Sequence, residues 1–375
     1  MRLRKGGLRK DESGLASVIA MSMMVMVVTA LFTVYQAFGV PGVCKDYEAR
    51  ALSDFFEGLK GLASAQKDVI TTDVVRGVPL KTQYSYPTIP FFLTPSYLEV
   101  GTGLYNVSVT IENIASDQVQ IPSTLTLKGE GVQTRFNALY STPVQAFVEL
   151  GLIATDSAYV DGSIINEGHI FIPFFEGTFF TNQLYPLSAG GKGILVRASD
   201  PSKNITIKIT GSKIPENAWR TYADMYGLDI TYTTNPATGD AEVTISLPPG
   251  NYTLASGIAS FGEGVPKDPT YLVARSPINQ RSPAVVDVEV VDEYFNPVPS
   301  DVTFKSLTGS VKVCSPTTTG SMSCDSLSAG DETSFFTEES SAVVENTGTG
   351  TAVLVTSIDR SVGGPYQLAF SVTRT

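Results

Sequence analysis

The chain has 375 residues, and its 37 acidic side chains outnumber the 26 basic ones, which gives a formal net charge of −11. This acidic balance argues against a nucleic-acid partner, because contact with phosphates needs a basic face. Three cysteines and one histidine leave little material for a zinc site or a histidine-based catalytic centre, so we expect no cofactor. An aromatic content of 10% excludes disorder over the whole chain, and the length suits about two domains.

A basic tail and a long uncharged segment come first. Residues 1–14 hold five basic and two acidic side chains, whereas residues 15–40 hold no charged side chain. At about 1.5 Å per residue, a helix of these 26 residues exceeds the ~30 Å hydrocarbon core of a bilayer. We therefore predict a transmembrane helix over residues 15–43, with the lipid bilayer as its partner. A cleaved secretory signal is the alternative, but its apolar region is usually only about 7–15 residues long. The basic tail predicts a cytoplasmic N-terminus and a single pass through the cell membrane, with the C-terminal bulk extracellular.

An amphipathic helix is expected after the membrane segment. Residues 39–42 contain two glycines and a proline, which allow a kink or a break. Apolar side chains then recur at helical spacing between residues 46 and 65, so we predict a stalk helix within residues 44–78. The sequence leaves open whether this helix lifts the folded part off the membrane or packs against its own domain. Cys44 stands near the membrane surface, where it either pairs between chains or stays free.

Strand patterns dominate residues 79–283, which we predict to be a β-rich extracellular domain. Alternation of apolar and polar residues is typical of antiparallel strands with one buried face. The clearest runs are residues 107–111, 124–127, 205–209 and 242–247. One helix is predicted, over residues 215–226, because a proline and an acidic residue stand at its start. Trp219 in this helix is expected to be a packing anchor.

Residues 84–95 need a separate interpretation, because they combine three prolines with four aromatic residues. Proline lacks an amide hydrogen, so this segment does not suit a helix or a central strand. We predict an extended crossing from the stalk helix to the first sheet. Its aromatic side chains are expected to be buried, and an exposed strip for a partner is the alternative.

The last part of the chain, residues 284–375, carries a motif. Val286, Val288 and Val290 alternate with acidic residues, and a turn follows that begins at Asp292 and contains Asn296-Pro297-Val298. This stretch resembles the second-strand motif of bacterial Ig-like modules of the invasin and intimin kind. The resemblance implies that the chain ends in an Ig-like β-sandwich. A glycine is usual before the asparagine in that motif, and this chain has Phe295 there.

The N-terminal segment also resembles a known signal. Basic residues, a short polar spacer and Gly14, followed by the apolar run from Leu15, resemble the signal of archaeal type IV pilin-like proteins. The resemblance implies cleavage between Gly14 and Leu15, with the helix retained in a filament core or a bilayer. The order of parts along the whole chain resembles a set of uncharacterised archaeal envelope proteins, which imply no activity.

Few residues are candidates for chemistry. Three Asn-x-Ser/Thr sequons, at Asn106, Asn204 and Asn251, are candidate glycosylation sites. Cys314 and Cys324 are predicted to form a disulfide, since an extracellular compartment permits oxidation. Neither a catalytic nor a metal-binding constellation is evident.

Three further features have ordinary structural interpretations. The single histidine, His169, is expected to be a structural residue, because nothing in the sequence nominates a nucleophile or an acid to act with it. The glycine-rich run 189–193 lacks the spacing of a phosphate-binding loop and is expected to be a hairpin turn. The acidic residues between 287 and 293 are expected to form a solvated strand face, with calcium at a module junction as the alternative.

The sequence favours a membrane-anchored extracellular structural or adhesive protein without catalytic activity. Its partners would be copies of itself, other envelope proteins or glycans. A pilin-like subunit of an archaeal surface filament is the alternative. A surface hydrolase is a third hypothesis, and it would need carboxylates that converge in a cleft.

Overall fold

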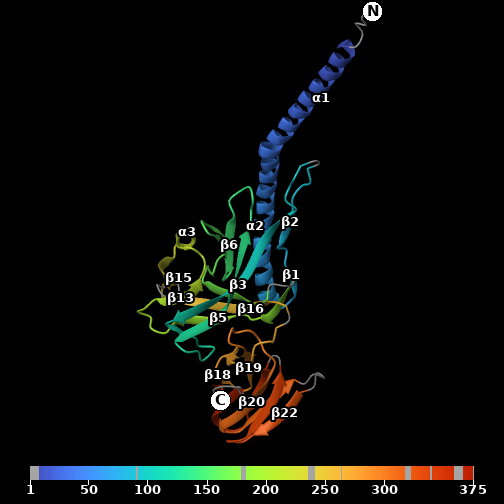
Figure 1. Ribbon diagram of the computed structural model, residues 1–375. Helices are drawn as coiled ribbons and strands as arrows, with labels where there is room; N and C mark the ends of the chain where they lie inside the picture. The colour runs from blue at the N-terminus through green and yellow to red at the C-terminus, as the bar shows by residue number, and fades with distance from the viewer. Residues whose placement is uncertain are drawn as a thin grey trace, which may run out of the picture. The chain divides into compact units, whose positions relative to one another are not determined.

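The computed structural model describes residues 8–89, 92–178, 183–234, 241–262, 264–316, 322–337, 340–358 and 366–374. The described chain is mainly β (Figure 1), as the sequence predicts. Its helical segments are α1 (Leu8–Val34), the π-helical turn η1 (Tyr35–Gly39), α2 (Val40–Thr72) and α3 (Glu216–Tyr226). Residues 1–7, which include the first part of the predicted basic tail, lie outside the described residues.

The chain divides into two compact units. The first unit comprises Met1–Glu57, Lys81–Gly101 and Phe136–Val144. The second comprises Gly58–Leu80, Thr102–Arg135 and Gln145–Thr375.

The sequence allows a kink or a break at residues 39–42, and the helix changes direction near this point without breaking (Figure 1). It continues from α1 through η1 into α2, and the Val40 N–H donates to the Tyr35 carbonyl across the wider π turn. Pro41 has no N–H to donate and its ring crowds the carbonyl four residues before it, so a local π turn is a physical way to keep the helix continuous. An added Cβ at Gly39 would lie 2.7 Å from the Tyr35 ring, so glycine leaves room for this ring.

One face of α2 is buried in both units, so this helix packs on folded structure instead of standing as a free stalk. In the first unit Phe55 is buried and its ring lies 5.5 Å from that of Phe136. In the second unit Leu59, Leu62 and Ile70 are buried, and the Ile70 carbonyl accepts a hydrogen bond of 2.7 Å from a backbone N–H in the second unit. Helix α2 begins at Val40 and ends at Thr72, whereas the predicted stalk helix lies within residues 44–78.

The proline-rich segment belongs to a hairpin of the first unit. Strand β2 (Gln83–Ser85) pairs antiparallel with the start of β3 (Tyr97–Glu112). Tyr84 and Tyr86 are buried, as predicted, but Phe92 is only half-buried and Leu93 is 85% exposed. The prediction of buried aromatic side chains therefore holds for Tyr84 and Tyr86 and only partly for Phe92. The far end of the segment also leaves the apolar side chain of Leu93 exposed.

The second unit contains a large mixed sheet with the order β1-β11-β16-β10-β5-β3-β13-β15-β14. The pair β10–β16 is parallel, whereas the predicted sheet was antiparallel throughout. The other strands on or beside this path have the following bounds: β1 Arg76–Gly77, β4 Ile114–Ala115, β5 Thr124–Phe136, β6 Val144–Glu149, β7 Leu152–Thr155, β8 Tyr159–Asp161, β9 Ile165–Asn166, β10 His169–Gly177, β11 Gln183–Ser188, β12 Ile194–Ala198, β13 Ile205–Ser212, β14 Asp229–Thr234, β15 Ala241–Leu247 and β16 Asn251–Phe261.

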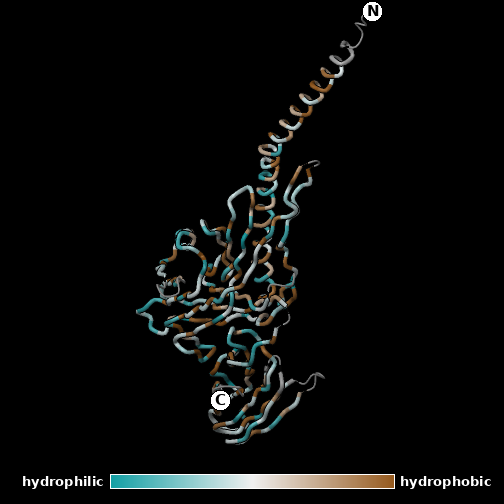
Figure 2. Tube along the Cα trace, in the orientation of Figure 1, coloured by the Kyte–Doolittle hydropathy of each residue, from teal (hydrophilic) through white to brown (hydrophobic). Residues whose placement is uncertain are grey.

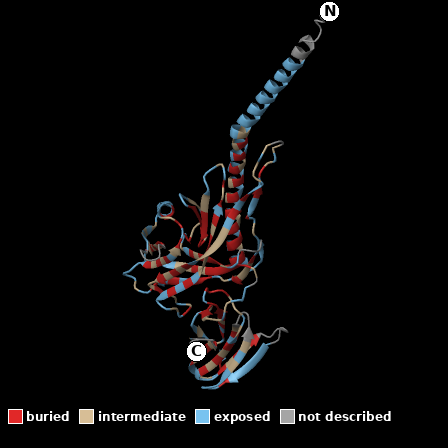
Figure 3. Ribbon diagram, viewed as in Figure 1, coloured by how far each residue is buried: buried red, intermediate tan, exposed pale blue. Residues whose placement is uncertain are grey.

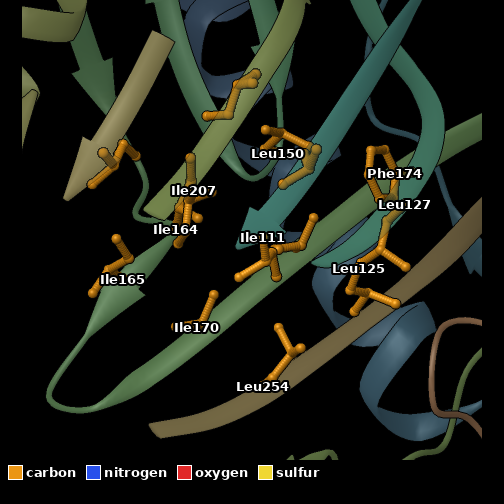
Figure 4. Close-up of a cluster of buried hydrophobic side chains, with 14 of the residues drawn as sticks. Ile111, Leu125, Leu127, Leu150, Ile164, Ile165, Ile170, Phe174, Ile207 and Leu254 are labelled. Atoms are coloured by element: carbon orange, nitrogen blue, oxygen red, sulfur yellow. The ribbon is translucent and has the colours of Figure 1, made fainter. Parts of the chain in front are cut away.

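The alternating runs predicted from sequence form the core of this sheet. The apolar members of the runs in β3, β5, β13 and β15 are buried, and their polar members are not (Figure 4). Helix α3 covers part of this core, and Trp219 is fully buried in it and donates from Nε1 to the Ser212 hydroxyl at 3.2 Å. The predicted helix and packing anchor are therefore confirmed.

Two five-stranded sheets form the C-terminal sandwich, with the orders β17-β19-β24-β21-β22 and β18-β26-β25-β20-β23. The neighbours β17-β19-β24-β21 and β20-β25-β26 reproduce the A-B-E-D and C-F-G order of an Ig-like sandwich. Its strands are β17 Tyr271–Ala274, β18 Asn279–Arg281, β19 Ala284–Val291, β20 Ser300–Thr308, β21 Val311–Pro316, β22 Met322–Leu327, β23 Glu332–Thr337, β24 Ser340–Asn346, β25 Gly350–Ile358 and β26 Tyr366–Arg374. Two of these strands precede residue 284, so the sandwich uses residues on both sides of the predicted boundary.

Candidate functional site

The most distinctive surface of the molecule is the apolar helix α1. Every side chain from Gly14 to Tyr35 is exposed, although most of these residues are hydrophobic (Figures 2 and 3). In the described part of the chain this is one helix that is long and apolar enough to span a membrane, by length and composition. An apolar surface of this size on a folded chain indicates a site of contact with lipid or protein.

Three of the four hydroxyl side chains between Gly14 and Val34 donate to carbonyl groups of the helix itself. The Ser22 hydroxyl donates to the Ile19 carbonyl at 2.9 Å, and the Thr33 hydroxyl donates to the Thr29 carbonyl at 2.8 Å. The Thr29 hydroxyl likewise donates to the Val25 carbonyl one turn before it. These hydroxyls therefore need no water, which is the condition for placing them in an apolar environment.

A small aromatic cluster lies where α1 passes into η1, and all of its members belong to the first unit. The Phe92 ring stacks on Phe32 with a centroid distance of 4.8 Å and lies 4.6 Å from the Tyr35 ring. The Gln36 side chain donates from Nε2 to the Leu93 carbonyl at 3.0 Å, and its Oε1 accepts from the Leu93 N–H at 3.3 Å. The sequence analysis missed this contact, although Gln36 stands out as the one amide side chain within residues 15–40.

A buried carboxylate fixes the next turns of the helix. Glu48 is fully buried and accepts hydrogen bonds from the Tyr86 and Ser141 hydroxyls. It also accepts from the backbone N–H groups of Leu139 and Tyr140 at 2.8 and 3.0 Å. Burial alone raises the pKa of a carboxyl, but these hydrogen bonds outweigh it and lower the pKa of Glu48. An ionised Glu48 thus ties α2 to the proline-rich hairpin and to a loop of the same unit.

The predicted modification sites lie at accessible positions. Asn106, Asn204 and Asn251 are all exposed, and the Asn204 side chain donates to the Ser246 hydroxyl at 2.8 Å. Gly14 and Leu15 are exposed within α1, so the predicted cleavage position is not covered by other described residues. Glycosylation and cleavage themselves stay predictions.

The three cysteines occupy two different environments. Cys314 and Cys324 face each other across β21 and β22 and are joined by a disulfide, the pairing that the sequence predicts. Cys44 is buried, and burial, together with the charge of Glu48, raises the pKa of its thiol. A buried, protonated thiol is a poor partner for a bond between chains, so Cys44 in this structure is a free cysteine.

His169 lies at the start of β10 in a cavity of about 580 Å³ within the second unit. Lys60 and Lys67 of α2 line the same cavity, together with Asp161 and Glu167. The His169 side chain is exposed and has no hydrogen-bond partner among the described residues, so the structure does not show the satisfied structural histidine that the sequence predicts. The charges around it are mixed, so the cavity favours neither an anion nor a cation.

A second groove, of about 640 Å³, collects acidic side chains. Glu130, Glu176 and Glu242 line it, as does the sequon residue Asn106. Burial, and then the charge of Glu176, raise the pKa of Glu130, whereas Glu176 pairs with Lys267 at 2.8 Å. The Lys128 side chain lines the same groove, so its charges are mixed. A pair of carboxyl groups at a defined separation is what glycoside hydrolysis requires. Among the described residues no group of His, Cys, Asp or Glu side chains is arranged to hold a metal ion.

The acidic residues near 287–293 do not form one solvated face. Glu289 is buried and pairs with Arg275, and Asp292 is buried in a turn, where its carboxylate accepts from the N–H groups of Tyr294 and Asn296 at 2.8 and 3.1 Å. Both groups are therefore occupied by protein partners, and the expectation of a solvated face was wrong for these two residues.

Asn296 of the Asn-Pro-Val turn joins the sandwich to the large sheet. Its Nδ2 donates to the Ser188 hydroxyl at 2.7 Å and to the Ser256 carbonyl at 2.8 Å, and its Oδ1 accepts from the Gly191 N–H at 3.0 Å. Gly191 belongs to the run 189–193, and an added Cβ there would lie 2.5 Å from the Asn296 Oδ1. The prediction of a hairpin turn was wrong, because β11 and β12, which this run connects, both pair with β16 and not with each other. The glycine-rich run instead packs closely against the Asn-Pro-Val turn.

Comparisons with known proteins give no family. No family model matches the chain, and no curated protein matches it. A solved structure of InvD from Yersinia pseudotuberculosis aligns over 73% of this chain and 91% of that chain, with 13% identity and a TM-score of 0.13. A likeness this low carries no argument about fold or function.

Proposed function

We propose that this protein is a membrane-anchored structural or adhesive protein of the cell surface. Residues 15–43 anchor it in the cell membrane, the basic tail lies in the cytoplasm, and the β-rich parts face the outside. It acts by presenting its folded surface to copies of itself, to other envelope proteins or to glycans, and it makes and breaks no covalent bonds.

The observation that carries this proposal is the fully exposed apolar helix. A soluble protein would expose more than twenty consecutive uncharged positions, most of them apolar, to water at a large cost in free energy, because each buried apolar side chain is worth roughly 1.5–3 kcal/mol. The hydroxyls of Ser22, Thr29 and Thr33 bond back to the helix, which lowers the cost of placing them in lipid. The disulfide between Cys314 and Cys324 supports the outward orientation of the C-terminal sandwich, since disulfides persist in oxidising compartments.

Membrane fractionation and surface proteolysis test the proposal. The full chain is expected to stay in the membrane pellet after extraction with alkaline carbonate. Protease added to intact cells is expected to remove the β-rich part and to leave a protected N-terminal fragment. Recovery of the chain in the soluble cytosolic fraction, with Cys314 and Cys324 reduced, would overturn the proposal.

A pilin-like subunit is the second candidate, and the exposure of Gly14 and Leu15 favours it. In a filament, the exposed face of α1 would pack against copies of itself in place of lipid. Mass spectrometry of the mature protein separates the two functions. A mature N-terminus at Leu15, together with recovery of the chain in sheared filaments, supports the filament, whereas an intact tail on Met1 opposes it.

A surface hydrolase is the third candidate, and the groove that contains Glu130 and Glu176 favours it. Turnover of soluble glycans or peptides by the full chain, lost in both Glu130→Gln and Glu176→Gln, would establish an enzyme. Equal inactivity of all three proteins supports presentation without catalysis. Asp229→Asn, an exposed carboxylate outside the lining of the groove, is the matched control.

A further inference from the structure

We propose that Phe92 and Leu93 form a second membrane contact, which enters the outer interface of the bilayer beside the anchoring helix. The inference deepens the proposed function and rests on it, because it needs α1 to lie in the membrane. Its partner is the lipid of the outer leaflet, at the boundary between headgroups and acyl chains.

The position of Phe92 and Leu93 beside the helix places them at the depth of the outer membrane interface. About 20 helical residues cross the hydrocarbon core, so the hydrocarbon part of the anchor over residues 15–43 starts at Leu15 and ends close to Val34, and the residues after it lie at headgroup level. Phe92 stacks on Phe32, which lies inside that limit, and also contacts Tyr35, which lies just outside it. Phe92 and Leu93 therefore lie at the level where the hydrocarbon ends.

The exposure of the side chains suits an apolar environment better than water. Leu93 is 85% exposed and Phe38, one turn beyond Tyr35, is 77% exposed, while Phe92 is half-buried against the helix. Aromatic residues are enriched at membrane–water interfaces, and Tyr35 and Phe92, whose rings lie 4.6 Å apart, form such a pair here. An exposed leucine beside an apolar helix continues the apolar surface of that helix.

The hydrogen bonds of Gln36 remove the main obstacle to this placement. A non-helical backbone in lipid is costly, because its N–H and C=O groups find no water. Both backbone groups of Leu93 are bonded to the Gln36 side chain, and both polar atoms of Gln36 are used in return. The Gln36 side chain and the Leu93 backbone thus satisfy each other's hydrogen-bonding groups.

Fluorescence quenching in vesicles tests the inference with the full chain. An environment-sensitive fluorophore is attached to Leu93→Cys, and the protein is reconstituted in phosphatidylcholine vesicles that carry a spin label at a shallow acyl position. The matched control is Glu99→Cys, an exposed position in strand β3 of the same hairpin, six residues further along the chain. The unsubstituted chain gives the labelling blank, because Cys44 is buried and the other two cysteines are bonded.

The expected result is loss of most of the Leu93→Cys fluorescence with the shallow quencher and little loss at Glu99→Cys. A third probe, Met24→Cys with a deep quencher, reports the anchor itself. Quenching at Met24→Cys without quenching at Leu93→Cys overturns the second contact and leaves the anchor intact. Absence of quenching at Met24→Cys overturns the proposed membrane anchor, and the second contact fails with it.

Discussion

Three buried carboxyl groups of this protein are stabilised in different ways. Glu48 keeps its charge because two hydroxyls and two backbone N–H groups donate to it, so its pKa is lowered. Glu149 is fully buried and accepts from the Tyr105 hydroxyl and the Lys213 N–H, but burial is the larger effect and raises its pKa. Burial also raises the pKa of Asp292, to about 6, against the lowering effect of its hydrogen bonds. The balance between burial, which raises the pKa, and accepted hydrogen bonds, which lower it, therefore decides the direction of the shift at each group.

The raised pKa of Asp292 predicts a specific pH dependence of stability. The folded state holds the Asp292 proton up to about pH 6, whereas the unfolded chain releases it near the ordinary value of 3.8. Stability therefore falls as the pH rises between these two values, by on the order of 3 kcal/mol, and the loss is complete above the folded pKa. The free energy of unfolding of the wild type minus that of Asp292→Asn, measured by denaturation at pH 4, 5, 6 and 7, should therefore decrease as the pH rises, because asparagine does not titrate. A value of this quantity that stays constant or increases with pH contradicts the prediction.

The backbone conformation of Phe295 predicts that a glycine variant is more stable than an alanine variant there, the reverse of the usual order in a strand. Its φ of +67° lies in the left-handed region, where glycine costs less than any residue with a Cβ, yet its ring is fully buried. Phe295→Ala and Phe295→Gly both remove the ring, at about 3–5 kcal/mol, but the glycine variant should be more stable than the alanine variant by about 1 kcal/mol. Phe304 is equally buried and has no positive φ, so Phe304→Gly should be less stable than Phe304→Ala. Urea denaturation of the four variants checks both orders, and the same order at both positions argues against backbone strain at Phe295.

At the scale of elements, α2 is part of the folded structure of both units. Leu59 has no exposed surface in the second unit, whereas Lys67, two turns further along the same helix, is exposed. Leu59→Ala is expected to lower the free energy of unfolding by about 2–5 kcal/mol, because it removes buried methyl groups and leaves a cavity. Lys67→Ala should change it by less than about 0.5 kcal/mol. Equal, small effects of both substitutions on denaturation would indicate a free stalk.

The disulfide predicts a local effect at the edge of the sandwich. Strand β22 pairs with β21 and, in the sheet as described, with no other strand, so the link between Cys314 and Cys324 joins an edge strand to its neighbour. The double variant Cys314→Ser/Cys324→Ser should lose up to about 3 kcal/mol, since the link closes a short loop in the unfolded chain. Hydrogen exchange should accelerate in β21 and β22 and stay unchanged in β13 and β15 of the large sheet. Reduced wild type is the matched control, and unchanged exchange in β22 after reduction contradicts the prediction.

The sequence predicts elements well where the signal is local. The alternation of Ile205, Ile207 and Ile209 specifies a strand with one buried face, and the proline and acid before Trp219 specify the start of a helix. The π turn is not predictable in this way, because Gly39 and Pro41 suit a break as well as a widened turn. The parallel pair β10–β16 also escapes prediction, since alternation does not report the direction of a neighbouring strand.

At the scale of the whole molecule, two side-chain links that the sequence analysis missed depend on distant partners. Gln36 meets Leu93 across 57 positions of the chain, and Asn296 meets Ser188 across 108. The glutamine, the asparagine and the missing glycine at Phe295 are visible in the sequence, but their partners are chosen by the fold. The apolar helix is the opposite case, because a long run of uncharged residues predicts a membrane helix from the sequence alone. The functional proposal therefore relies on the part of the chain that is most directly predictable.

Because the functional proposal depends on α1, substitutions in this helix test the membrane anchor in the full chain. Met24 and Val27 lie near the middle of the apolar segment, are 70% and 58% exposed, and can be changed without removing a packing contact in either unit. Two arginines at the centre of a membrane helix cost about 5–7 kcal/mol of insertion free energy, at about 2.5–3.5 kcal/mol each. Met24→Arg/Val27→Arg should therefore move the chain from the carbonate-resistant pellet to the supernatant, whereas Met24→Leu/Val27→Leu should stay in the pellet. Circular dichroism should show the same strand content in both proteins, because the β-rich parts do not use these side chains. Retention of the arginine variant in the pellet would mean that α1 is held by protein and not by lipid, as a helix packed in a filament core would be.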